Sequence, residues 1–265
     1  MGSRVLGVDF SGASDAGEGI WLTEAAGEPD GLSVTDCFNA GDRWGTDRQR
    51  AHGRLREYVA DEAFDVVAVD APFSLPKPVL EACCGGHWAG LVEWVGGDGG
   101  PDDAVAFAEQ CRDAASETTG DTDHLRRETD FRRGALCPYD VRTQYQTYWG
   151  VRNVIGPLAR TDGVAVAPMQ DDAETVVIEA YPAATFGWLG LYREGYKGDD
   201  GARDRRATNV EGIEACSVDL DAHRELYTSV HDALDSLAAA VTAGRVADGA
   251  RPDPHGPRSE GHIYV

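Results

Sequence analysis

The amino-acid sequence predicts an α/β fold in which a sheet of mixed strand direction is flanked by helices. Three apolar segments follow one another across short loops at the start of the chain, a pattern typical of an antiparallel meander. A helical segment over residues 47–62 then leads to a fourth apolar segment, and a strand reached through a helix usually lies parallel to its neighbour. A fifth segment, rich in β-branched residues, covers residues 175–180. Strands of both directions with helices between them indicate the α/β class.

The first predicted strand covers residues 5–8 and is followed by an acid. Val5 and Val8 are β-branched, and no polar side chain precedes Asp9 in this segment. A Ser–Gly pair then supplies turn chemistry, so Asp9 is expected where a core strand ends. An ionised carboxylate in an apolar setting is costly unless it is paired or binds a metal. Asp9 therefore either opens a turn or serves as a ligand, and the acids found later in the chain favour the ligand.

Two further strands and a helix come next. Residues 19–23 and 32–38 are the predicted strands, and Gly and Pro residues between them supply a turn. Residues 47–62 are predicted to be helical because Leu55 and Val59 lie four positions apart on one apolar face, with charged residues elsewhere. The two strands complete the antiparallel meander, and the helix forms the crossover to the fourth strand.

The fourth strand repeats the pattern of the first. Residues 64–70 form an apolar, β-branched run that ends in Asp70, and Pro72 cannot continue a central strand. If this strand pairs in parallel with the first, Asp9 and Asp70 lie side by side. Adjacent strands are about 4.8 Å apart, a separation at which two carboxylates can share a divalent cation.

The segment from residue 77 to 175 has a looser pattern and is interpreted as an inserted, mostly helical subregion of a single domain over residues 1–265. Helices are predicted over residues 102–117 and 141–158. The segment also holds the densest basic cluster of the chain, which is either a solvated, salt-bridged surface or a set of phosphate contacts. Because its two ends leave acid-bearing strands, we expect it to form a lid or side wall over the acids. The candidate phosphate-binding residues are Arg126, Arg127, Arg132, Arg133 and Arg142.

The remaining candidate acids belong to the fifth strand and to a late helix. Glu179 lies near the end of the fifth strand, either as a ligand or as the partner of a nearby arginine, and Pro182 is placed to open a helix. The late helix begins near Tyr227 and carries Asp232 and Asp235, three positions apart and so on one side of the helix. Residues 260–265 are expected to add a short closing strand.

Six cysteines permit a second type of metal site. Cys83, Cys84 and His87, with Cys111 or Cys137, form a possible zinc site, although their spacing matches no standard zinc motif. Reduced cysteines in a cytosol otherwise behave as small buried apolar residues.

Composition limits the class of protein. Asp and Glu number 46 against 24 Lys and Arg, a formal net charge of −22, and the 42% hydrophobic content fits a globular protein. Such an acidic composition, with Lys77 and Lys197 as its two lysines, suggests adaptation to a high-salt cytosol, where charge repulsion is screened. A signal segment and an apolar run of roughly 20 residues are both missing, so a cytoplasmic protein without membrane association is expected.

Together the acid-bearing segments resemble the ribonuclease H-like nucleases. Locally, residues 7–9 and 232–238 are similar to the strand and helix motifs of Holliday-junction resolvases, which usually carry Glu where this chain has Asp70. Over its length the chain resembles domain of unknown function family 429, a family of predicted nucleases. The motifs that carry this resemblance are residues 7–12 (GVDFSG), 70–76 (DAPFSLP), 179–182 (EAYP) and 260–263 (EGHI).

The resemblance implies a mixed five-stranded sheet in the order 3-2-1-4-5, with the insertion between strands 4 and 5. It also implies a metal-dependent nuclease that cleaves DNA or RNA with two ions, Mg²⁺ or Mn²⁺. Asp9, Asp70 and Asp235 would bind the metal, with Asp232 or Glu179 assisting in catalysis.

Two other functions stay open at this stage. One is a non-catalytic domain on the same fold that binds nucleic acid or protein, since fold does not determine function. The other is an actin-like phosphotransferase, which would need further glycine-rich phosphate loops that the sequence does not show.

Overall fold

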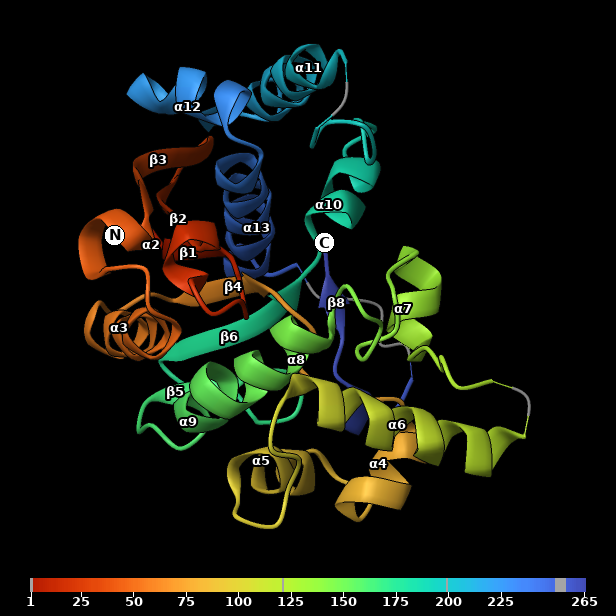
Figure 1. Ribbon diagram of the computed structural model, residues 1–265. Coiled ribbons are helices and arrows are strands. Elements are labelled where there is room, and N and C mark those ends of the chain that lie inside the picture. Colours follow the sequence, from red (N-terminus) through yellow and green to blue (C-terminus); the bar gives the residue numbers. More distant parts are fainter. Residues whose placement is uncertain (1, 121, 199, 251–255) are drawn as a thin grey trace.

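The computed structural model describes residues 2–120, 122–198, 200–250 and 256–265. Within these residues, eight strands form one mixed sheet in the order β5-β6-β4-β1-β2-β3-β7, with β8 paired to β6 (Figure 1). The strands are β1 Arg4–Asp9, β2 Trp21–Glu28, β3 Gly31–Asn39, β4 Val66–Asp70, β5 Val164–Val166, β6 Thr175–Ala180, β7 Val218–Asp219 and β8 Ile263–Tyr264.

The strand directions follow the sequence prediction, but the number of strands does not. β1, β2 and β3 form the antiparallel meander, and β4 pairs in parallel with both β1 and β6. The five predicted strands are neighbours in the sheet, and β5 and β7 extend it at its two edges. The prediction of a five-stranded sheet was therefore wrong. Strands of two or three residues, such as β7 and β5, are too short to show the alternation of apolar and polar residues by which a strand is predicted. The predicted closing strand is β8.

The predicted helices are present with adjusted bounds. Residues 47–62 correspond to α3, whose first turn is capped by the Asp47 carboxylate accepting from the Arg50 amide at 3.0 Å. Residues 102–117 correspond to α6. The helix predicted from residue 141 begins at Gln144, because a turn closed by the Gln144 amide on the Asp140 carbonyl precedes it. The helices are α1 Ala16–Gly19, α2 Ala40–Trp44, α3 Arg48–Asp61, α4 Lys77–Cys84, α5 Trp88–Gly96, α6 Ala104–Thr119, α7 Glu128–Arg133, α8 Gln144–Gly150, a π-helix Val151–Ile155, α9 Gly156–Leu158, α10 Pro182–Trp188, α11 Ala202–Glu214, α12 Arg224–Ser229 and α13 His231–Ala247, with 3₁₀ turns at Asp221–His223 and Arg258–Glu260.

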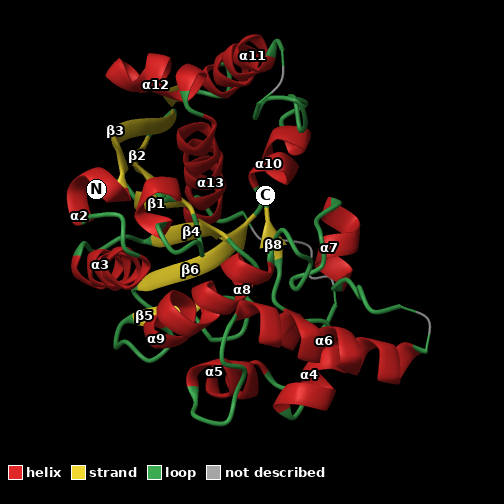
Figure 2. Ribbon diagram, viewed as in Figure 1, coloured by secondary structure: helices red, strands yellow, loops and turns green. Residues whose placement is uncertain are grey.

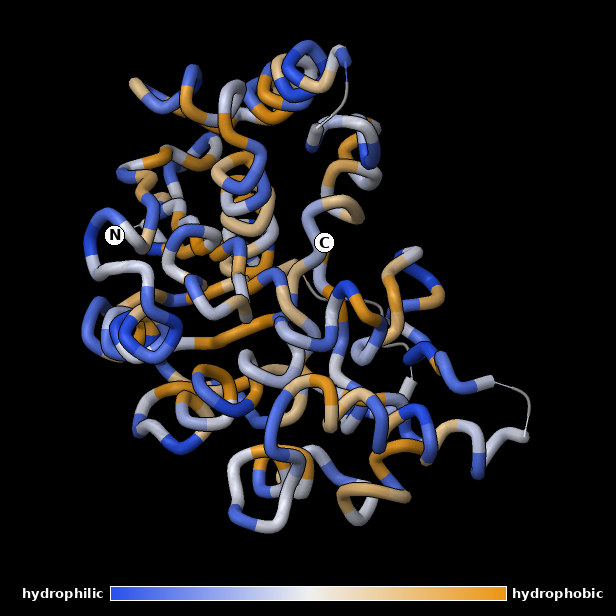
Figure 3. Tube along the Cα trace, viewed as in Figure 1, coloured by the Kyte–Doolittle hydropathy of each residue, from blue (hydrophilic) through white to orange (hydrophobic). Residues whose placement is uncertain are grey.

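Helices cover both faces of the sheet. α13 packs on one face, where its small residues meet β1 and β4; a Cβ on Gly7 would lie 2.1 Å from the Ser236 carbonyl oxygen. This close approach is possible only because residue 7 is glycine. The side chains of Leu6 and Val8 point to the other face and pack with Leu55 and Val59 of α3. Figure 2 shows α13 above β4 and β6, with α8 and α9 below them, and Figure 3 shows the apolar residues along the strands.

The segment over residues 77–175 is largely helical, as predicted. It contributes α4 to α9 and the edge strand β5, and its apolar side chains share one core with those of β1 and α3. Its helices gather at one end of the molecule, and α10 to α13 gather at the other (Figure 1). Among the described residues, we find no helix with the length and apolar character needed to cross a bilayer.

Candidate metal centre

Asp9 and Asp70 are brought together by strand pairing. They are the last residues of β1 and β4, and the parallel register places Asp9 directly opposite Asp70. Side chains alternate along a strand, so Asp9 lies on the same face as Val5, and Asp70 on the same face as Ala68. Val5 and Ala68 both pack against α13. Both carboxylates therefore project from the α13 side of the sheet.

Asp235 completes a group of three acids from that helix. It lies in the second turn of α13 and is fully buried. Each of Asp9, Asp70 and Asp235 offers a carboxylate oxygen, and these three oxygens all lie within 4.8 Å of one another. Clustered carboxylate oxygens are the ligands that Mg²⁺, Mn²⁺ and Ca²⁺ prefer, so this set of donors fits a divalent cation.

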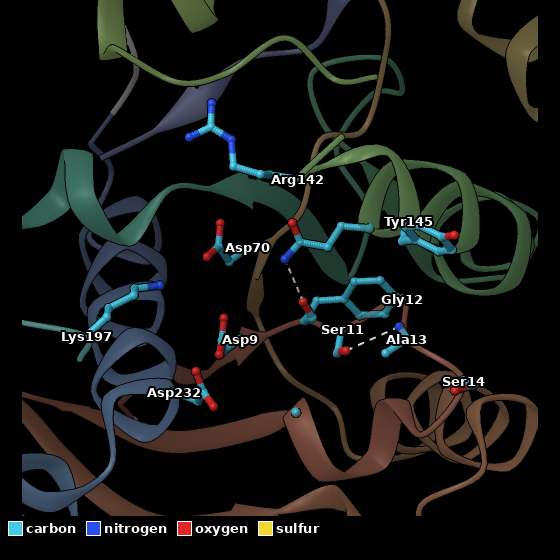
Figure 4. A pocket seen from close by; sticks show the side chains of 13 residues that line it. Asp9, Ser11, Gly12, Ala13, Ser14, Asp70, Arg142, Tyr145, Lys197 and Asp232 are labelled. Carbon is cyan, nitrogen blue, oxygen red and sulfur yellow. Dashed lines mark hydrogen bonds between the residues drawn. The ribbon is translucent and has the colours of Figure 1, made fainter. Parts of the chain in front are cut away.

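Asp232 lies one turn earlier on α13, at the edge of the same cavity (Figure 4). Its Oδ1 is 2.6 Å from the Nδ1 of His231, and its side chain also hydrogen-bonds with Asp9. Burial raises the pKa of Asp232, but the His231 hydrogen bond and charge and the Lys197 ammonium lower it below its ordinary value. Asp232 is therefore an anionic neighbour of the three acids.

Two residues at the site were missed by the sequence analysis. The Nζ of Lys197 lies 2.5 Å from Oδ2 of Asp235, and the hydroxyl of Tyr196 donates to Oδ1 at 2.8 Å. The loop that carries them is held by α11, because Arg206 donates to the Tyr196 carbonyl at 2.6 Å and Arg205 donates to the Gly195 carbonyl at 2.8 Å. The one available sequence signal was the rarity of lysine, since Lys197 is one of two in the chain.

The three acids strongly perturb one another's ionisation. Burial is the main cause that raises the pKa of each carboxyl, and it is followed for Asp9 by the charges of Asp235 and Asp70. Burial raises the pKa of Asp70 to about 7, although the Lys197 ammonium opposes the shift. Perturbed acids in a cavity are typical of functional sites. Full ionisation of this group needs more positive charge than one lysine supplies.

Glu179 does not join the metal-binding group. In the sheet it pairs with Val69, the residue before Asp70, and therefore projects to the opposite face. Its two carboxylate oxygens accept from the Arg127 guanidinium at 2.5 and 2.8 Å, and one also accepts from the Phe73 amide at 2.9 Å. Glu179 was expected either to bind the metal or to pair with an arginine, and in the structure it pairs with Arg127.

Arg127 was wrongly placed among the phosphate contacts. Its side chain is 0% exposed and is held between Glu179 and Asp130, which it contacts at 2.6 and 3.0 Å. This ion pair joins α7 to β6 behind the loop that follows Asp70. A guanidinium enclosed by two carboxylates has no donor left for a substrate phosphate.

Three of the other four candidate arginines also face away from the acids. Arg126 and Arg132 line a separate cavity beside Glu260, and Arg133 lines neither cavity beside the acids. Arg142 is different, because it is 68% exposed and lies at the rim of the cavity that contains Asp9 and Asp70 (Figure 4). Of the predicted basic set, Arg142 alone lines the cavity that contains both Asp9 and Asp70.

The cavity above the acids has a volume of about 580 Å³ and is walled by residues 10–14 and α8. The loop after Asp9 lies close against α8, since a Cβ on Gly12 would be 2.1 Å from the Tyr145 carbonyl oxygen. The Ser11 carbonyl lies 2.9 Å from Nε2 of His52. As predicted, part of the 77–175 segment thus forms a side wall of the site.

Four of the six cysteines, Cys83, Cys84, Cys111 and Cys137, lie in the 77–175 segment. Burial raises the pKa of Cys83, Cys84, Cys111 and Cys137, so these thiols stay protonated. Among the described residues, the ligand atoms of Asp9, Asp70 and Asp235 form a group that could hold a metal ion, and those of the cysteines do not.

Comparison with known proteins finds a family match over part of the chain. Residues 152–258 match the family described as "Protein of unknown function (DUF429)", the family that the sequence motifs indicated. The matched stretch contains Glu179, Lys197, Asp232 and Asp235, and it leaves Asp9 and Asp70 outside. No curated protein and no solved structure matches the chain.

Proposed function

We propose that this protein is a metal-dependent phosphodiesterase that cleaves nucleic acid on a ribonuclease H-like fold. The observation that carries the proposal is the meeting of Asp9, Asp70 and Asp235, with three carboxylate oxygens within 4.8 Å of one another. Their origin from two adjacent parallel strands and one helix supports the resemblance on which the nuclease prediction was based.

The residues divide into a metal-binding group and a phosphate-binding group. Asp9, Asp70 and Asp235 would hold Mg²⁺ or Mn²⁺, which supplies Lewis acidity and an acidified water when bound. Lys197 and Arg142 line the same cavity and would neutralise the substrate phosphate. Tyr196 orients Asp235 through its hydroxyl.

Burial of the acids favours a catalytic site over the alternative, a non-catalytic domain that only binds nucleic acid or protein. Asp235 is 0% exposed and Asp9 is 7% exposed, so their mutual repulsion is poorly screened by water. Such an arrangement is costly to keep without a cation, and a domain that only binds a partner does not need it.

The test measures metal binding and cleavage separately. Calorimetry with Mn²⁺ should show binding that Asp9→Asn removes, and labelled single-stranded, duplex and junction DNA and RNA should be tested for cleavage with Mn²⁺ or Mg²⁺. We expect Asp9→Asn to lower cleavage by at least about 100-fold, a size typical of losing a metal ligand. Asp162→Asn, which changes an exposed acid outside the cavity, serves as the control.

Two results would contradict the proposal. Absence of Mn²⁺ binding in the unmodified protein excludes the metal centre. Metal binding without cleavage of any of these nucleic acids favours the non-catalytic binding domain.

A further inference from the structure

Two cavities meet at Asp70. The larger, of about 580 Å³, extends from the acids along residues 11–14 to Tyr145. The smaller, of about 210 Å³, reaches Tyr181, the residue that follows β6. Both are lined by the same four side chains, namely Asp70, Arg142, Gln146 and Lys197. Asp70 therefore lies at the junction of the two cavities, and Asp9 and Asp232 line the larger one.

Each cavity presents an aromatic ring, and two cations line both cavities: Arg142, which pairs with Asp140 at 3.1 Å, and Lys197, which pairs with Asp235 at 2.5 Å. Tyr145 is 43% exposed on α8, and Tyr181 is half-buried where α10 begins. In Figure 4, Lys197 and Tyr145 lie on opposite sides of the acids, and Arg142 lies above Asp70. Aromatic rings on which bases stack, placed on either side of a charged groove, are the usual platform for single-stranded nucleic acid.

We infer that the substrate is a single strand of nucleic acid that occupies both cavities, with the scissile phosphate at the junction beside Arg142 and Lys197. A base on one side of that phosphate stacks on Tyr145, and the strand continues on the other side toward Tyr181. This inference rests on the proposed function and adds the substrate class to it.

The charge distribution argues against a duplex. Specific duplex binding buries about 1,000–2,500 Å² of protein surface and uses many basic side chains along both backbones. Here Arg142 alone of the five candidate arginines lines the larger cavity, and Arg127 lines the smaller one but is enclosed by Glu179 and Asp130. The net charge of −22 also repels an extended polyanion. A cavity of about 580 Å³ lies within the range of small-ligand sites of roughly 300–1,000 Å³, a size suited to one or two nucleotides.

Binding without cleavage tests the inference. Oligonucleotides carrying the fluorescent base 2-aminopurine are titrated in Ca²⁺ as a single strand and as the matching duplex. We expect the single strand to bind at least about tenfold more tightly and its fluorescence to be quenched by stacking. Tyr145→Ala should weaken single-strand binding about fivefold or more and reduce the quenching, whereas Tyr145→Phe should keep both. Tyr192→Ala is the matched control, since Tyr192 is 48% exposed and lines neither cavity.

Three results would overturn the inference: equal or tighter binding of the duplex, unchanged affinity and quenching in Tyr145→Ala, or an equal loss in Tyr192→Ala. They differ from a failure of the proposed function, which appears as absence of Mn²⁺ binding or of all cleavage. A protein that binds metal and cleaves only duplexes would keep the proposed function and refute the single-strand inference.

Discussion

The Nζ of Lys197 lies 2.5 Å from Oδ2 of Asp235, while the hydroxyl of the preceding residue, Tyr196, donates to Oδ1 of the same carboxylate. One loop therefore engages both oxygens of a candidate metal ligand. Tyr196 is buried, whereas the Lys197 side chain is 55% exposed. The lysine is placed to compete with a cation for Asp235.

The first prediction follows from this competition. Lys197→Met removes the ammonium while keeping an unbranched side chain, so the acids should bind Mn²⁺ about fivefold more tightly, the equivalent of about 1 kcal/mol for a partly exposed ion pair. Lys197→Arg keeps the charge and should stay near the original affinity. Lys77→Met changes the other lysine, which pairs with Glu81 at 3.6 Å, and should have no effect. Calorimetric titration measures all four proteins, and equal affinities would exclude competition.

Asp9 gives the second prediction. In the metal-free protein, Asp9→Asn removes one of three mutually repelling carboxyl groups, so the free energy of unfolding should rise, by about 1 kcal/mol. The same variant should lose the stabilisation that Mn²⁺ gives to the original protein, because a metal stabilises only the state that binds it. Thermal unfolding with and without Mn²⁺ measures both effects. A less stable metal-free variant that still responds to Mn²⁺ would contradict the assignment of Asp9.

The buried ion pair gives the third prediction. Arg127→Met leaves Glu179 and Asp130 buried without their cation, which should cost about 3–5 kcal/mol of unfolding free energy. Arg132→Met removes a half-exposed pair with Glu128 and should cost less than about 1 kcal/mol. Urea unfolding distinguishes the two variants. If both variants lose similarly little unfolding free energy, Arg127 is not a buried ion-pair partner, and a role for it as a phosphate contact would have to be considered again.

Asp9 and Asp70 could be predicted as neighbours because each ends an apolar strand, and the crossover between those strands implies parallel pairing. Asp235 was predicted as a metal ligand and Asp232 as an assisting residue, but the helical period alone does not distinguish them, because both lie on one side of the helix. The rotation of α13 about its own axis decides which of the two aspartates faces Asp9 and Asp70. The close contact of Gly7 with Ser236 sets that rotation. The spacing of apolar residues along the helix does not reveal such a contact.

Glu179 and Arg127 show a second limit of sequence reasoning. Glu179 pairs with Val69 and not with Asp70, one residue further along β4. This difference of one residue puts the Glu179 side chain on the face of the sheet opposite to the three acids. Arg127 has the same charge as Arg126 and Arg132 beside it, and only tertiary packing buries it. Lys197 lies in a loop without periodicity, so no pattern linked it to Asp235.

His52 gives the fourth prediction, which concerns pH. Burial, followed by the charges of Arg48 and Arg56, lowers the pKa of His52 to about 4, although the Ser11 carbonyl and Asp47 act in the opposite direction. Between pH 6.5 and 4 the unfolded chain binds a proton that the native protein does not, so stability should fall as pH falls through this window, by up to about 3 kcal/mol.

The variant His52→Gln isolates this contribution. Glutamine can donate to Ser11 but does not titrate, so the fall in stability between pH 6.5 and 4 should become smaller than in the original protein. Urea unfolding at several pH values measures the difference. Parallel pH profiles for the two proteins would show that His52 is not held neutral.

The fifth prediction concerns salt, because a net charge of −22 and a nucleic-acid substrate must be compatible. The Debye length falls from about 10 Å at 0.1 M salt to about 3 Å at 1 M, so repulsion across the acidic surface is removed while direct contacts remain. Binding at the junction of the two cavities involves Arg142, Lys197 and a metal, and few counterions are released. We therefore expect unfolding free energy to rise, and single-strand binding in Ca²⁺ to be kept or improved, between about 0.2 M and 2 M KCl. Tight binding at low salt that is steeply lost on titration would instead indicate an extended basic surface, which would contradict both the predicted adaptation to high salt and the proposed two-cavity site.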